Sequence, residues 1–255
     1  MSTHEVVFSI ARHAAWAPGV TSSEAWAAWA DAPWSIAMGE EPKVAAMPAM
    51  LRRRAGFLGR MALEVAYECM DGQADVPYEC MDGQADVPTV FCSRHGEVAR
   101  SIELLSDLAR GEPLSPTAFG LAVHNASAGL FSIARADRAN HVALAGGTAT
   151  VEHAVIEASG MLADGAPSVL LVACDAPLPE LFAGFEDCHE QPWAFAWLMT
   201  AAGADPLRLS WQGGARMDDA TRTPGGLDVL RFQLGAANAL VRHAGAMRWT
   251  WSRNA

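Results

Sequence analysis

The residues best placed to do chemistry are Gly146, Gly147 and Thr148, which lie between an apolar run and a helix-forming segment. A turn that leads from a strand into a helix presents its side chains to the helix N-terminus, where backbone N–H groups and the helix dipole favour negative charge. Acyl-transfer enzymes use this geometry for a serine or cysteine nucleophile. A threonine hydroxyl would need a nearby base to act in this way. Because threonine is also a good N-cap, we expect Thr148 to cap the helix rather than to attack a substrate.

Other catalytic and cofactor motifs are missing from the sequence. The Gly146-Gly147 pair lacks the third glycine and the distant acid of a dinucleotide fingerprint, and neither a GxSxG motif nor a P-loop occurs. The five cysteines have no paired CxxC spacing, which predicts reduced thiols and neither a disulfide framework nor a zinc site. We therefore expect no metal and no other cofactor.

The composition is that of an ordinary globular protein, with 255 residues of which 51% are hydrophobic and 18% charged. A net charge of -11 argues against nucleic acid or an anionic membrane as a partner, since both need a positive footprint. The local exception is the run Arg52, Arg53 and Arg54. No basic leader precedes an apolar stretch at the N-terminus, and no apolar run approaches the ~20 residues of a spanning helix. These features predict a cytoplasmic protein.

Two apolar strands joined by one helix position the glycine turn. Residues 141–145 form the first apolar run, residues 151–162 carry a helical apolar stripe, and residues 168–173 form the second run. This pattern is typical of a βαβ unit whose parallel strands are buried on both faces. It predicts an α/β fold.

Strands and helices alternate along the rest of the chain, without a linker, so residues 1–255 are predicted to form one domain. Further strands are predicted at 6–10, 89–93, 195–200, 207–211 and 247–251, and helices at 22–30, 51–65, 98–108, 116–133 and 227–243. The eleven residues Tyr67–Pro77 are repeated at once as Tyr78–Pro88. A unit this short is no solenoid repeat, and we interpret it as a duplication that lengthens a surface loop.

A set of spaced residues carries a family resemblance: Ser115-Pro116, Asn125, Gly129, His153-Ala154 and Gly165. With this spacing, the stretch from Ser115 to Asp175 resembles the centre of a β-ketoacyl synthase, the condensing enzyme of fatty-acid and polyketide synthesis. The family's active cysteine then falls on Thr148. A competing register matches residues 142–148 to a later strand of the family, but a full helix and a second apolar strand follow here and favour the first register.

Upstream, the segment Arg94-His-Gly-Glu97 and the arginine-rich helix from Arg52 fit the N-terminal region of the same family. The sequence is most similar to the divergent β-ketoacyl synthase-like N-terminal group, short proteins that accompany ketosynthases in aryl-polyene-type pathways. The resemblance implies a thiolase-like half-fold with a mixed, mostly parallel sheet and helices on both faces.

The departures from the family concern its chemistry. The active cysteine is replaced, and the His-Gly-Thr loop and Gly-His turn that hold the family's two catalytic histidines do not occur. The resemblance therefore implies a non-catalytic subunit that forms a heterodimer with an active ketosynthase, as a chain length factor does. An acyl carrier protein is a further expected partner.

Several residues are candidates for these roles. The acyl-tunnel candidates are Phe119, His124, Asn125, Gly146 and Gly147, and the carrier-docking candidates are Arg52, Arg53 and Arg54. Each group has a structural alternative, namely core packing for the phenylalanine, a buried polar pair for His124 and Asn125, and a solvated helix face for the arginines. Two other functions stay in view: an active acyltransferase that uses Thr148 or a partner's residues, and an unrelated α/β small-molecule binding protein.

Overall fold

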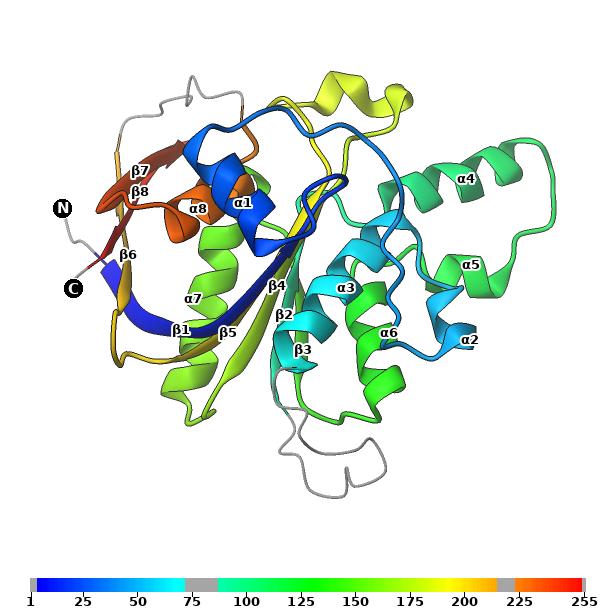
Figure 1. Cartoon of the computed structure of the whole chain (residues 1–255). Helices are drawn as coiled ribbons and strands as arrows, with labels where there is room; N and C mark the ends of the chain where they lie inside the picture. The colour runs from blue at the N-terminus through cyan, green and yellow to red at the C-terminus, as the bar shows by residue number, and fades with distance from the viewer. Residues whose placement is uncertain (1–3, 72–86, 215–222, 254–255) are drawn as a thin grey trace.

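A computed structural model describes residues 4–71, 87–214 and 223–253 (Figure 1). Its centre is one eight-stranded sheet with the strand order β3-β2-β4-β5-β1-β6-β8-β7. The strands are β1 (His4–Trp16), β2 (Thr89–Cys92), β3 (His141–Leu144), β4 (Val169–Asp175), β5 (Trp193–Ala201), β6 (Leu207–Gly213), β7 (Ala239–Ala244) and β8 (Met247–Arg253). The α-helices are α1 (Ser23–Asp31), α2 (Ala49–Arg52), α3 (Phe57–Asp71), α4 (Val98–Ala109), α5 (Pro116–Gly120), α6 (Ala126–Arg135), α7 (Thr150–Ala163) and α8 (Gly225–Leu234). There are also two 3-10 turns among the described residues. The turn η2 (Gly147–Ala149) directly precedes α7, and the turn η3 (Glu180–Phe185) follows β4.

The strand directions differ from the predicted mostly parallel sheet. Parallel pairing joins β2 to β3 on one side and to β4 on the other. Strand β5 runs antiparallel between β4 and β1, and β6, β8 and β7 continue the sheet with antiparallel pairs. The α/β class is confirmed, but the mostly parallel pairing was wrong. The family resemblance implied the mostly parallel sheet, and the one βαβ unit visible in the sequence says nothing about how distant strands pair.

The predicted βαβ unit is present as β3, α7 and β4, but the sequence did not predict that another strand lies between its two strands. Strand β2 lies between β3 and β4, so the two strands of the unit do not pair with each other. All seven residues of β4 are buried, as predicted. Strand β3 is instead an edge strand of the sheet, and its four residues are half-buried or exposed.

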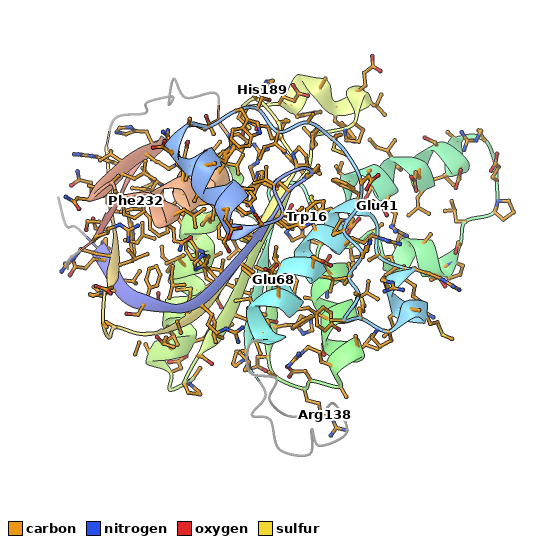
Figure 2. All side chains as sticks on the ribbon, in the orientation of Figure 1. Trp16, Glu41, Glu68, Arg138, His189 and Phe232 are labelled. Atoms are coloured by element: carbon orange, nitrogen blue, oxygen red, sulfur yellow. The ribbon has the colours of Figure 1, made fainter. Side chains whose placement is uncertain are left out.

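Helices cover both faces of the sheet, which confirms that part of the prediction. Because side chains alternate along a strand, β4 sends Val169, Leu171 and Ala173 into one apolar core. The intervening Leu170 and Val172 enter the second core. The first core also contains residues of α1, α7 and α8, and the second contains residues of α3 and α6. Figure 2 shows the side chains that fill the space between these layers.

The C-terminal strands enclose α7. On β8, the ring of Trp249 lies edge-on to His153 of α7 at 5.1 Å, and Trp251 donates to Glu152 of α7 at 3.3 Å. Since α7 also packs on β2 and β4 near the other end of the sheet, the sheet must curve around this helix. Arg253, at the end of β8, donates to the last free carbonyls of α8, at Phe232, Gln233 and Gly235.

Three helix predictions needed correction. The helix predicted at 51–65 is divided, because the chain turns between α2 and α3. The helix predicted at 116–133 is divided into α5 and α6. The helix predicted at 227–243 ends at Leu234, and residues 239–244 form β7 because they pair with β8 through a turn at Gly245 with φ of 59°. Helix α1 begins as predicted, with the Ser22 hydroxyl accepting from the N–H of Ala25.

Helices α4 and α5, together called the α4–α5 arm, extend away from the sheet (Figure 1). No residue of either helix is buried, and Leu105, Leu108 and Phe119 are 58%, 59% and 66% exposed. Most of the duplicated segment, residues 72–86, lies outside the described residues. Among the described residues, no helix is long and apolar enough to span a membrane.

Candidate functional site

The glycine turn joins β3 to α7 through η2, and its geometry is set by Thr150. The Thr150 hydroxyl accepts from the N–H of Gly146 at 3.0 Å and donates to the carbonyl of Gly147 at 2.7 Å. Gly147 has φ of 59°, a conformation that glycine adopts without strain. The expectation that Thr148 caps the helix was wrong, because Thr148 lies within η2 and α7 begins only at Thr150. The cap position falls on Ala149, which has no side-chain hydrogen bond.

His153 fixes the other side of the turn. Its Nδ1 donates to the carbonyl of Ala149 at 2.8 Å, and a Cβ on Gly146 would lie only 2.7 Å from the same nitrogen. Glycine at position 146 therefore lets the imidazole pack against the turn. The Nδ1 position of His153 is engaged with the backbone and is not aimed at Thr148.

A buried ion pair lies against the turn. Arg242 of β7 donates through Nη2 to the carbonyl of Thr148 at 2.9 Å and through Nη1 to Glu152 of α7. The side chains of Arg242 and Glu152 are 6% and 0% exposed. Gly225, at the start of α8, makes room for this arrangement, because a Cβ there would lie 2.9 Å from the Thr148 carbonyl oxygen. The end of β7 and the start of α8 thus close over the turn.

The hydroxyl of Thr148 has no bonded base among the described residues. Within residues 4–71, 87–214 and 223–253, no side chain forms a hydrogen bond with its hydroxyl, whereas an alcohol nucleophile needs a base within hydrogen-bond reach. The charged group beside Thr148 is a guanidinium bonded to its carbonyl, and a guanidinium cannot accept a proton. The contacts at this turn hold its backbone in place.

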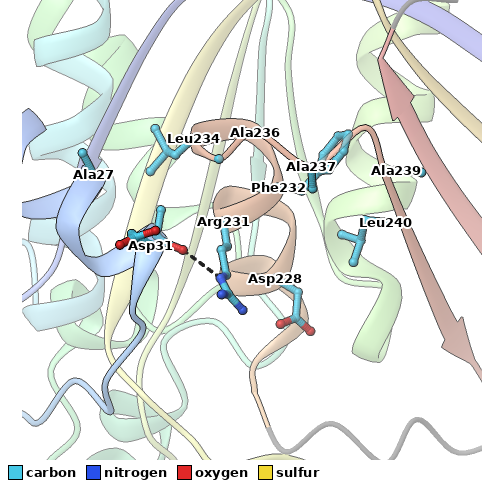
Figure 3. A pocket seen from close by; sticks show the side chains of 12 residues that line it. Ala27, Asp31, Asp228, Arg231, Phe232, Leu234, Ala236, Ala237, Ala239 and Leu240 are labelled. Carbon is cyan, nitrogen blue, oxygen red and sulfur yellow. Dashed lines mark hydrogen bonds between the residues drawn. The ribbon is translucent and has the colours of Figure 1, made fainter.

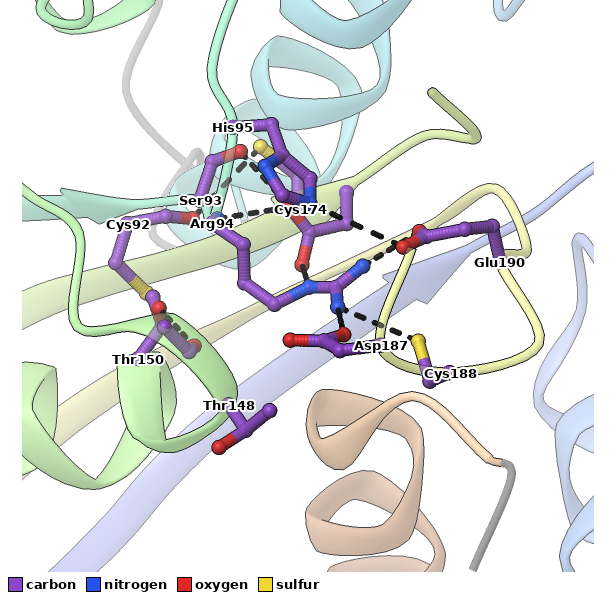
Figure 4. A network of polar contacts seen from close by, with 12 residues as sticks. Cys92, Ser93, Arg94, His95, Thr148, Thr150, Cys174, Asp187, Cys188 and Glu190 are labelled. Atoms are coloured by element: carbon purple, nitrogen blue, oxygen red, sulfur yellow. Dashed lines mark hydrogen bonds and ion pairs between the residues drawn. The ribbon is translucent and has the colours of Figure 1, made fainter. Parts of the chain in front are cut away.

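A second polar cluster is centred on Arg94, directly after β2 (Figure 4). Arg94 donates through Nε to Asp175 at the end of β4 at 3.1 Å. Its other nitrogens donate to Asp187, Glu190 and the sulfur of Cys188, all in the loop before β5. The side chains of Arg94, Asp175 and Glu190 are each about 5% exposed or less. The guanidinium of Arg94 therefore joins the ends of β2 and β4 to the loop before β5.

Backbone and hydroxyl groups complete this cluster. Asp175 also accepts from the hydroxyl of Ser93 and from the N–H of Arg94, both at 2.9 Å. Burial raises the pKa of Asp175, while Arg94 and Ser93 favour its ionised form. Burial likewise raises the pKa of Cys188 to about 12, so this thiol is not poised as a nucleophile. Although burial opposes the charged form of Glu190, hydrogen bonds from His95 and Arg94 hold its pKa below the usual range.

The ligand-type atoms of this cluster are occupied by Arg94. Asp187, Cys188 and Glu190 place their ligand atoms within 4.8 Å of one another, close enough to consider a metal ion. The guanidinium of Arg94 bonds to all three and already supplies positive charge there. Sequence reasoning noted the segment 94–97 only as part of the family resemblance. The acidic residue Asp175 at the end of a buried strand was the sequence signal that could have indicated the partner of Arg94.

The same segment reaches the start of α3 through Glu97. The Glu97 carboxylate accepts from the N–H of Gly59, and Cβ atoms on Gly56 or Gly59 would lie 3.2 or 3.1 Å from its oxygens. Glycine at both positions lets the carboxylate approach the helix N-terminus, where the helix dipole favours negative charge. Burial nevertheless raises the pKa of Glu97, and Arg100 and the Gly59 hydrogen bond only partly oppose this.

The acyl-tunnel candidates do not form one group. His124 donates through Nε2 to the carbonyl of Leu144 at 3.0 Å, which places it beside the end of β3 and near the glycine turn. It also lines a small hollow together with Cys92, Cys174 and Glu97. Asn125 is exposed and makes no side-chain cap to α6, and Phe119 projects from α5 with 66% exposure.

The arginine candidates differ from one another. Arg52 is half-buried and donates to the carbonyl of Val44 at 3.3 Å, so it holds the preceding loop. Arg53 and Arg54 are exposed. The structure therefore leaves these last two side chains at the surface.

An open pocket of about 570 Å³ lies between α1, α8 and β7, away from the glycine turn (Figure 3). Asp31, Asp228 and Arg231 are its charged residues, and Arg231 donates to the carbonyl of Ala30 at 2.9 Å. The rest of its lining is mainly alanine and leucine. None of the residues predicted to be functional lines it.

The model of the β-ketoacyl synthase N-terminal domain matches residues 26–252. The chain therefore belongs to the β-ketoacyl synthase N-terminal domain family, as its glycine turn and strand pattern suggested. This match overturns the alternative of an unrelated α/β binding protein. No curated protein sequence matched the chain.

Solved structures of ketosynthase complexes are similar to the chain. One is a chain of a ketosynthase (ApeO) in complex with its chain length factor (ApeC) from Xenorhabdus doucetiae, with 25% identity, 97% of this chain and 100% of that chain covered, and a TM-score of 0.82. The ishigamide ketosynthase/chain length factor has 16% identity, covers 84% of this chain and 69% of its own, and has a TM-score of 0.60. A type II PKS acyl-carrier protein complex with its ketosynthase has 10% identity, 98% and 99% coverage, and a TM-score of 0.68. The thiolase-like fold of a ketosynthase is thereby confirmed.

The raised pKa of Glu97 predicts a specific pH dependence of stability. A raised pKa in the folded state means that this group stabilises the fold fully below its unfolded value of 4.5, and that this contribution is lost as pH rises through the folded pKa. Glu97→Gln should mimic the protonated form, so the variant should gain stability relative to the wild type as pH rises from about 4.5 to 7. Thermal unfolding across this range measures the difference. Glu112→Gln, at an exposed carboxylate, is the control, and parallel curves for wild type and Glu97→Gln would contradict the prediction.

Proposed function

We propose that the chain is a non-catalytic, chain-length-factor-like subunit that pairs with an active ketosynthase during acyl-chain elongation. The observation that carries this proposal is that Thr148, which the family resemblance aligns with the active cysteine, lies in a turn that Arg242 and Glu152 close. A chain of a ketosynthase–chain length factor complex matches 97% of this chain, which supports a partner role of the same kind.

The absence of an activating group at the turn favours this role over catalysis. A thiol near neutral pH ionises far more readily than an alcohol, so a family member with threonine at this position loses its acyl acceptor unless a base compensates. Among the described residues, the nearest imidazole of α7 is bound to the carbonyl of Ala149. The turn keeps a shape related to the family's site and lacks its reactive groups.

The exposed apolar side chains of the α4–α5 arm support pairing with a second subunit. Leu105 and Leu108 on α4 and Phe119 on α5 are all more than half exposed. Large apolar side chains grouped at a surface are typical of interaction sites. Strand β3 lies at the same end of the sheet and offers a free edge, which a partner could also cover. We propose that this end of the molecule faces the ketosynthase.

The first prediction from the proposed function concerns pairing and catalysis together. The chain should co-purify with its ketosynthase partner, and Thr148→Ala should leave the elongation rate of the complex within about twofold of wild type, because the hydroxyl takes part in no bond formation. The measurement is product formation from carrier-bound substrates by the reconstituted pair. Loss of activity in an intact Thr148→Ala complex would favour the acyltransferase alternative. Failure of the wild-type chains to associate would refute the partner role.

A second prediction concerns Phe119 as a residue that lines the partner's acyl tunnel. If its ring limits the space for the growing chain, Phe119→Ala should shift the products of the complex to longer chains, since the substitution removes a large side chain. Mass spectrometry of the released acyl chains measures the shift. Leu114→Ala, at a 40% exposed residue just before α5, is the control and should leave product length unchanged. An unchanged product from an intact Phe119→Ala complex would remove Phe119 from the tunnel.

A third prediction concerns the carrier protein, for which we propose Arg53 and Arg54 as contacts. Both side chains are exposed, and an acidic carrier would be attracted to them. The double variant Arg53→Glu, Arg54→Glu should weaken carrier binding to the complex by about tenfold at low salt, and less at high salt because exposed charges are screened. Titration calorimetry measures this affinity. The same reversal at Arg110, an exposed arginine directly after α4 that is paired with Asp107 and Glu112, is the control; equal effects at both places would show only a general charge effect.

A further inference from the structure

The 3-10 turn η3 presents two of the three most exposed large apolar side chains of the described residues. Leu181 is 75% exposed and Phe185 is 70% exposed. The ring of Phe182 packs against that of Phe185 with centroids 5.7 Å apart. Single exposed apolar residues are common on proteins, but two within one six-residue turn, supported by a third aromatic ring, mark a surface suited to binding.

The loop that carries this turn is anchored at both ends. It begins at Asp175, which Arg94 holds, and it ends at Asp187 and Glu190, which the same arginine also holds. Within the loop, the N–H of Phe182 donates to the carbonyl of Pro179 at 2.7 Å. A surface that is already ordered loses less entropy on binding, which is a property of efficient docking sites.

A second exposed aromatic residue lies on a segment tied to this loop. The hydroxyl of Ser35 and Nε2 of His189 are 3.0 Å apart, and this contact joins the segment after α1 to the loop before β5. Trp34 and His189 line a common hollow of about 390 Å³, and Trp34 is 47% exposed. The exposed apolar surface around η3 therefore has an aromatic neighbour.

The charges around η3 are acidic. Glu180 and Glu186 flank the turn and are exposed, and residues 176–190 contain no lysine or arginine. A second copy docked on this surface would bring two acidic rims together, and an acidic carrier protein would be repelled in the same way. The surface suits a partner that offers an apolar pocket with arginine or lysine at its rim.

We propose that Leu181 and Phe185 insert into a basic-rimmed apolar pocket on the ketosynthase subunit; this inference rests on the proposed function. The apolar side chains supply the buried centre of the contact, and Glu180 and Glu186 pair with cations at its edge. The contact lies outside the α4–α5 arm, so it adds a separate point of attachment between the two subunits.

The test is binding of the full-length chain to the ketosynthase, measured by surface plasmon resonance. The variant Leu181→Ala, Phe185→Ala should bind at least about tenfold more weakly, because large central side chains dominate interface energies. Its unfolding temperature should stay close to that of wild type, since both side chains are exposed. The matched control is Met50→Ala, Val241→Ala, which truncates two other exposed apolar residues and should bind like wild type.

Charge reversal tests the chemistry of the partner surface. Glu180→Lys, Glu186→Lys should slow association and reverse its salt dependence, because rim charges act mainly on the association rate. If the wild type binds the ketosynthase and the Leu181, Phe185 variant binds equally well, this inference is overturned and the partner role stands. If the wild type fails to bind, both are overturned. Loss of self-association alone in the variant would identify a second copy as the occupant and would also overturn the inference.

Discussion

The buried charge of Arg94 is the constraint on which the rest of the structure depends. A guanidinium removed from water needs its donors satisfied, and removing one partner of such a pair typically costs about 3–5 kcal/mol. Here Asp175, Asp187 and Glu190 satisfy it from the end of β4 and from the loop before β5. The arrangement holds the ends of β2 and β4 together, and it also orders the loop that carries η3. A single side chain thus joins the ends of two parallel strands to the loop that carries the proposed docking turn.

A second buried ion pair holds the backbone of the glycine turn. Arg242 and Glu152 lie against the Thr148 carbonyl, and their mutual attraction ties β7 to α7 across the turn. The two pairs hold neighbouring parts of the molecule by electrostatics and leave no ionisable group bonded to the Thr148 hydroxyl among the described residues. In a family defined by acyl transfer, such a turn is suited to a structural role. This is consistent with a subunit that shapes a complex instead of reacting within it.

The curvature of the sheet decides which surfaces are available to a partner. Trp249 and Trp251 of β8 pack toward α7, so the helix that follows the glycine turn is enclosed by the chain's own C-terminal strands. Exposed apolar side chains on the α4–α5 arm and on η3 lie outside this enclosed region. Because burial of apolar area is the main favourable term in association, these surfaces and not the turn itself are where a second subunit would gain affinity.

The sequence by itself determined the local elements and the family. The Ser22 cap of α1, the apolar run of β4 and the spacing of α7 depend on residues close together in the chain, so they could be predicted from periodicity and capping rules. Only the tertiary structure decided that β2 lies between β3 and β4, that β5 is antiparallel, and that residues 239–244 are a strand instead of a helix. It also decided that Thr150 closes the turn and that Arg94 meets Asp175, 81 positions away. These outcomes depend on hydrogen bonds and charges between distant segments, and no local pattern encodes which of the possible partners will meet.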